Sequence, residues 1–77
     1  MIYTMRNLSQ LAIGEDAIII EVKDMLLGCK LITMGIVPGN NVRIVRKAPF
    51  GNTLYIKSGT QSIALRKLEA QHIEVSL

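Results

Sequence analysis

Short runs in which apolar and polar residues alternate dominate the chain, and they predict strands rather than long helices. The alternation is found in 17–23, 41–47, 53–57, 61–65 and 71–77. Three consecutive isoleucines in the first run strengthen this prediction, because β-branched side chains favour extended backbone. Turn-forming residues separate the runs, so the pattern predicts about five strands in a mainly β protein built as a small, partly open barrel.

One helix is expected after the first strand. Asp24 is placed to cap a helix over 25–34, and Gly35 can adopt the left-handed conformation that ends it. At 100° per residue the apolar positions of this helix form two stripes instead of one. The first stripe is Leu27, Leu31 and Met34, and the second is Met25, Cys29 and Ile32. One stripe can cover a core, so we expect part of the second to be exposed or to meet another chain.

Two shorter helical turns are expected, over 6–11 and over 66–70. The first has Asn7 as its N-cap, with Gln10 three residues later as in a capping box. The expected inward-facing residues are Leu27, Leu31, Val42, Ile44, Leu54, Ile56, Ile63, Leu65, Ile73, Val75 and Leu77.

The length of 77 residues limits the chain to one domain, 1–77, and excludes a two-domain enzyme. Cys29 is the only cysteine, so an intrachain disulfide and a closed multi-cysteine zinc site are excluded. No apolar run approaches the roughly 20 residues of a membrane-spanning helix, and no direct membrane insertion is expected. These features favour a cytoplasmic protein.

The charges are distributed unevenly. The formal net charge is +3, and no acidic residue occurs between Met25 and Leu68. If the middle three strands form an antiparallel meander, one outward face is basic with a single aromatic ring. Its expected members are Arg43, Val45, Lys47, Tyr55, Lys57, Ala64 and Arg66. Such a face attracts nucleic acid, anionic lipid or an acidic protein.

Few residues are suited to catalysis or metal binding. His72 and Glu74 share one face of the last strand, but two ligands are fewer than a metal site normally has. Cys29 lies on an apolar helix position with no base beside it, which favours a packing or interface role. We therefore expect no enzyme activity, no metal site and no cofactor.

Nucleic-acid binding is the alternative that the basic face leaves open. Barrels that bind single strands use several aromatic stacking platforms. The chain offers only Tyr3, Phe50 and Tyr55. Nucleic acid is therefore not the expected partner.

Several segments in order resemble the ferrous iron transport protein A (FeoA) family, over about 8–75. They are Lys30-Leu31-Ile32-Thr33-Met34-Gly35-Ile36-Val37-Pro38-Gly39, Arg46-Lys47-Ala48-Pro49-Phe50-Gly51, Ile63-Ala64-Leu65-Arg66-Lys67-Leu68-Glu69-Ala70 and Ile73-Glu74-Val75. Many members have proline where this chain has Thr53. The resemblance implies an SH3-like β-barrel and a non-enzymatic accessory role beside FeoB, the membrane ferrous-iron transporter with its own GTP-binding domain.

This resemblance supplies a partner for the surface features. The hypothesis is that the second helix stripe and the basic strands together dock FeoB on its cytosolic side. The residues concerned are Met25, Cys29, Ile32, Arg43, Arg46, Lys47, Lys57 and Arg66. The alternatives are that the stripe packs under the barrel or forms a homo-oligomer contact. Other functions left open are a nucleic-acid-binding barrel, a metal-responsive regulatory domain and a ferrous-iron carrier using Cys29 and His72.

Overall fold

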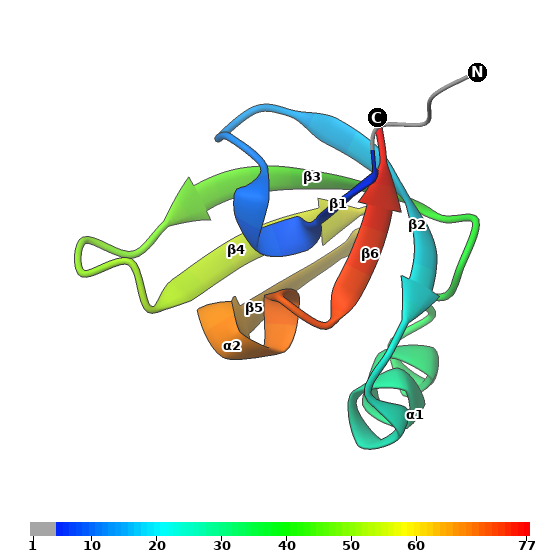
Figure 1. The fold of residues 1–77 in the computed structure, drawn as a ribbon. Helices are drawn as coiled ribbons and strands as arrows, with labels where there is room; N and C mark the ends of the chain where they lie inside the picture. Colours follow the sequence, from blue (N-terminus) through cyan, green and yellow to red (C-terminus); the bar gives the residue numbers. More distant parts are fainter. Residues whose placement is uncertain (1–4) are drawn as a thin grey trace.

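The computed structural model describes residues 5–77, which form one six-stranded antiparallel sheet with two short α-helices (Figure 1). The strand order is β1-β6-β2-β3-β4-β5. The strands are β1 (Met5–Asn7), β2 (Asp16–Val22), β3 (Asn41–Lys47), β4 (Thr53–Ser58), β5 (Gln61–Arg66) and β6 (Ile73–Ser76). All five predicted strands are confirmed, and β1 is an addition.

The N-terminal segment contains both a strand and a helical turn. β1 pairs with β6, and the 3-10 helix η1 (Leu8–Gln10) follows directly. Asn7 is the N-cap as predicted, and its backbone N–H donates to Gln10 Oε1 at 3.0 Å. The prediction of a helical turn from residue 6 was wrong for Arg6, which lies opposite Val75 in the sheet. A three-residue strand is too short to show alternation.

The helix after β2 begins where its cap predicts. Asp24 accepts a hydrogen bond from the backbone N–H of Leu27 at 3.0 Å, and α1 covers Met25–Thr33. Gly35 has a φ of +77°, the left-handed conformation expected at the helix end. The other helix, α2 (Lys67–Ala70), lies between β5 and β6 and is one residue shorter than predicted. No helix in the described part of the chain is long and apolar enough to cross a membrane.

A single cluster of buried apolar residues forms the core, and the helices close it. Leu27 and Leu31 of α1 contribute to it, with Met34 packed against it. The sequence interpretation missed Leu8, Leu11 and Ile36, which lie outside the regular strands and the main helix, and Ala70 in α2. It also assigned no inward face to the first strand, where Ala17 and Ile19 are buried. The buried set is Leu8, Leu11, Ala17, Ile19, Leu27, Leu31, Ile36, Val42, Ile44, Leu54, Ile56, Leu65, Ala70, Ile73 and Val75.

Two expected inward residues differ from the prediction. Ile63 is only half-buried and packs against the core. Leu77 is 54% exposed, so its inward assignment was wrong. The pairing of β6 with both neighbours ends at Ser76. Leu77 therefore lies beyond the sheet, and the alternation of inward and outward side chains does not extend to it.

We expect Leu31→Ala to destabilise the protein by about 2–5 kcal/mol, because it removes a fully buried side chain and leaves a cavity. Leu26→Ala is the matched control on the same helix, since Leu26 is 84% exposed, and we expect a change within about 0.5 kcal/mol. Urea denaturation of both variants measures the difference. Equal losses would contradict the assignment of the two helix faces.

Candidate functional site

The exposed face of α1 is apolar. Met25 is 84% exposed, Ile32 is 59% exposed, and Cys29 is an exposed free thiol. Leu26, which the sequence interpretation did not include, is also 84% exposed. Leu27 and Leu31, on the other side of α1, are buried in the core. The alternative in which the second stripe packs under the barrel is therefore wrong.

The basic face of the sheet has a different register from the one expected. The pairing of β3 with β4 shifts between Ile44 and Arg46, so that Val45 is an extra residue. Arg46 therefore lies opposite Tyr55, with its guanidinium carbon 4.4 Å from the ring centroid, and Lys47 lies opposite buried Leu54. The strict alternation that placed Lys47 on the same face as Tyr55 was wrong, because the bulge shifts the register of later residues, and Lys47 is half-buried.

Arg43 is held by an acidic side chain from β2. Its Nε and one terminal nitrogen each donate to an oxygen of Asp16 at 2.8 Å, and the two residues are opposite each other in the sheet. The hydrogen bond from Arg43 lowers the pKa of the Asp16 carboxyl, and the same contact raises the pKa of Arg43. The expected contribution of Arg43 to a free positive surface is thus largely compensated.

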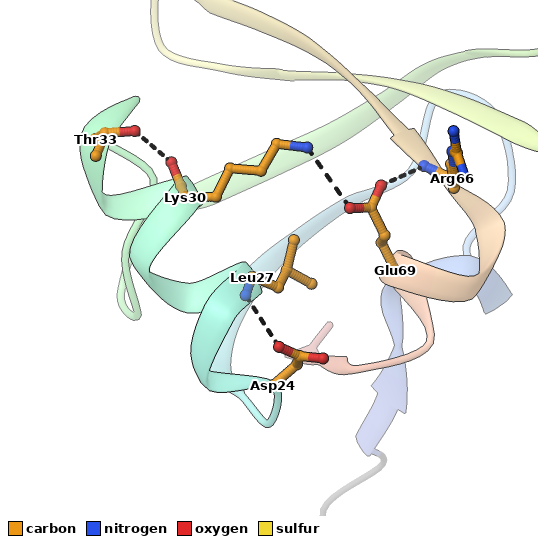
Figure 2. A network of polar contacts seen from close by, with 6 residues as sticks. All are labelled: Asp24, Leu27, Lys30, Thr33, Arg66 and Glu69. Carbon is orange, nitrogen blue, oxygen red and sulfur yellow. Dashed lines mark hydrogen bonds and ion pairs between the residues drawn. The ribbon is translucent and has the colours of Figure 1, made fainter.

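Three other ion pairs compensate further cations. Lys30 Nζ lies 3.6 Å from Glu69 Oε2, and Figure 2 shows this contact joining α1 to α2. The other two pairs are Arg6 with Glu15 at 3.9 Å and Lys23 with Glu74 at 3.1 Å. Within residues 5–77, the basic side chains outside ion pairs are Arg46, Lys47, Lys57, Arg66 and Lys67. All five belong to the β3–β4–β5–α2 segment, so the positive surface is smaller than the acid-free interval suggested.

The outer face of β3, β4 and β5 contains a shallow groove of about 580 Å³. Arg46 and Tyr55 line it with small and apolar neighbours, among them Val45, Ile63 and Ala64. This groove supplies one cation and one aromatic ring, a combination that can contact a carboxylate or a planar group.

The predicted helix stripe and the basic residues lie on different elements, α1 for the stripe and β3, β4 and β5 for the cations. Within the described residues, no hydrogen bond, ion pair or groove includes both a residue of the stripe and one of the basic sheet residues. That Met25, Cys29 and Ile32 form one docking surface with Arg43, Arg46, Lys47, Lys57 and Arg66 stays a prediction.

The residues considered for metal binding are dispersed. His72 lies in the turn before β6, and the carboxylate of Glu74 is engaged by Lys23, whose pKa it raises through their hydrogen bond. Cys29 is on α1. Across residues 5–77 no three histidine, cysteine or carboxylate side chains are grouped so as to hold a metal ion.

Comparison with protein families gives a match over almost the whole chain. The model of the FeoA domain matches residues 6–77. A curated relative from Porphyromonas gingivalis, an Fe(2+) transport protein A/Fe(2+) transporter FeoB fusion protein, is 31% identical over 72 residues. The match covers 92% of this chain, which spans only 8% of the length of the fusion protein.

Solved structures share the fold. Iron(II) transport protein A from Clostridium thermocellum has a TM-score of 0.84 and 42% identity, with 92% of this chain and 44% of that chain covered. FeoA from Stenotrophomonas maltophilia, an SH3 domain protein solved with zinc, has a TM-score of 0.79 and 32% identity. That match covers 91% of this chain and 88% of the other. The predicted SH3-like fold is confirmed.

Arg43→Gln should raise the pKa of Asp16 toward its ordinary value, because the donor that stabilises the carboxylate is lost. The folded-state pKa of Asp16 lies below the unfolded value of about 3.9, so the pair stabilises the fold above that pH. This contribution is lost as the pH falls through the folded-state pKa. NMR titration of the Asp16 carboxyl carbon measures the shift.

The matched control is Lys57→Gln, which removes the cation directly opposite Arg43 on β4 without touching the carboxylate. An equal rise of the Asp16 pKa in this control would show that general positive charge, and not the hydrogen bond, sets its value.

Proposed function

Because the chain belongs to the FeoA family, we propose that it is an accessory protein of ferrous iron uptake that acts by binding the FeoB transporter. The relative from Porphyromonas gingivalis carries transport protein A and FeoB in one polypeptide. Fusion gives two modules a high effective concentration for each other, which is useful when they act together. This relationship supports FeoB as the partner, contacted on its cytosolic side.

The observation that carries this proposal is the exposed apolar face of α1. Met25, Cys29 and Ile32 are exposed on a helix whose other side is buried. Such a face fits into an apolar groove of a partner, the helix-in-groove mode of recognition. Leu26 extends the same apolar surface and is added to the docking residues.

The basic residues have a different part in this proposal. Arg46, Lys47, Lys57 and Arg66 lie outside ion pairs in the described chain and supply positive potential that speeds encounter with an acidic partner. Arg43 contributes less because Asp16 neutralises it. We therefore place the apolar helix at the centre of the contact and the cations in long-range steering.

The distribution of titratable groups supports an accessory role over an enzymatic one. General acid–base catalysis needs groups that converge on one substrate atom. Here Glu15, Asp16, Glu69 and Glu74 are each in ion pairs, and Asp24 caps α1. The proposed action is therefore binding alone.

We expect the double variant Met25→Asp with Ile32→Asp to weaken binding to the cytosolic part of FeoB by about tenfold or more, because buried apolar anchors dominate most interfaces. Calorimetric titration with and without GTP, at two salt concentrations, measures the affinity. Circular dichroism verifies that the variant remains folded. Ile13→Asp is the matched control, since Ile13 is 60% exposed but lies outside α1.

Three outcomes decide the proposal. Loss in the helix variant with retention in the control supports docking through α1. Equal affinity of the helix variant and the unmodified protein would remove α1 from the contact. If the unmodified chain binds under no condition, the cytosolic part of FeoB is not its partner. Sedimentation of the unmodified chain at the same concentrations shows whether a second copy covers the helix instead.

A further inference from the structure

The loop between β3 and β4 presents an aromatic side chain that the fold does not use. Phe50 is 90% exposed, the highest value for a large apolar side chain within residues 5–77. Figure 1 shows this loop projecting from the end of the sheet that lies away from α1. Phe50 is absent from the core cluster, so packing within this domain does not account for an aromatic residue here.

Backbone hydrogen bonds give the loop a defined shape. The N–H of Ala48 donates to the carbonyl of Thr53 at 2.8 Å, and that of Gly51 donates to the carbonyl of Ala48 at 2.9 Å. Gly51 has a φ of +73°, which favours glycine at this position. The N–H of Lys67 donates to the carbonyl of Asn52 at 2.9 Å and ties the loop to α2.

A second apolar side chain lies at this junction. Leu68 of α2 is 71% exposed. It lines a groove of about 520 Å³ together with Asn52, Thr53, Arg66 and Lys67. Because the carbonyl of Asn52 accepts from the N–H of Lys67, the loop that carries Phe50 and the start of α2, which carries Leu68, are neighbouring segments.

Three cations at this end lie outside ion pairs. Lys47, Arg66 and Lys67 form no ion pair with any residue of the described chain. The neighbouring acid, Glu69, accepts from the backbone N–H of Arg66 at 3.0 Å and contacts Lys30 on α1 (Figure 2). The carboxylate of Glu69 is thus paired with Lys30, and the cations around the loop have no ion-pair partner among the described residues.

We propose that this end of the molecule, defined by Phe50, Leu68, Lys47, Arg66 and Lys67, docks on the surface of an anionic lipid bilayer. Aromatic and aliphatic side chains enter the boundary between headgroups and acyl chains, while lysine and arginine contact anionic headgroups. A nucleic acid fits less well, because one ring provides a single stacking platform and Leu68 provides none.

This contact is interfacial and needs no membrane-spanning segment. The expectation of no direct insertion rested on the absence of a long apolar run, which an exposed loop does not require. The contact differs from that of the proposed function, since it centres on the loop and Lys67 in place of Met25 and Ile32, although Leu68 also lines a groove of about 310 Å³ with Leu26 of α1. Its test contains no transporter, so the failure of either proposal is recognised separately.

The first experiment is flotation of the full chain with vesicles of phosphatidylglycerol and phosphatidylcholine, or of phosphatidylcholine alone, at low and physiological salt. We expect binding only to the anionic vesicles, and weaker binding at higher salt. Lys67→Gln should weaken it about fivefold, since each cation near an anionic surface contributes about that factor. Lys57→Gln removes the same charge at the far end of β4 and should have little effect.

The second experiment places a reporter at the loop. The chain contains no tryptophan, so Phe50→Trp introduces the only one. We expect its fluorescence to shift to shorter wavelength with the anionic vesicles, because the indole leaves water. Ile32→Trp on exposed α1 is the matched control and should show no shift.

Several outcomes overturn the proposal. Absence of flotation at low salt excludes bilayer binding. If Lys67→Gln and Lys57→Gln weaken vesicle binding equally, the net charge of the protein drives binding and the proposed surface has no special part in it. A shift of the Ile32→Trp spectrum in place of the Phe50→Trp spectrum places α1 at the lipid. Retention of a single-stranded oligonucleotide, lost in Lys67→Gln without any flotation, assigns the surface to nucleic acid.

Discussion

The insertion of Leu27 and Leu31 into the core is the contact on which the arrangement of the molecule depends. A chain of 77 residues buries a small fraction of its surface compared with larger domains, so each core side chain matters. One nine-residue helix supplies these two side chains. Because the helix lies at the margin of so small a domain, no other part of residues 5–77 covers its other face. The exposed apolar stripe is therefore a direct consequence of closing the core with one short helix.

Ion pairing determines which part of the surface carries uncompensated positive charge. The net charge of +3 is modest, but four cations are held by carboxylates and five in the β3–β4–β5–α2 segment are not. Three-dimensional pairing therefore concentrates the positive potential on one part of the surface. The Lys30–Glu69 contact joins the two helices. It also engages the carboxylate of α2, the helix that carries Lys67.

Local patterns in the sequence were sufficient for most of the fold. Alternation located five strands, and Asp24 and Gly35 marked the ends of α1. Several of the errors arose because local patterns do not specify strand partners. Neither the bulge at Val45 nor the pairing of Asp16 with Arg43 can be read from one segment, because both depend on the neighbouring strand. The apolar helix stripe was predictable, whereas the neutralisation of Arg43 by Asp16 was not.

The shape of this domain limits how it can act. The core of the described residues is filled by apolar side chains, and the hollows described above are grooves on the surface of the domain. The extents of 37 × 25 × 23 Å make it longer than it is wide. Helix α1 and the loop between β3 and β4 lie toward different ends in Figure 1. A contact proposed for α1 and one proposed for the loop therefore involve different parts of the domain.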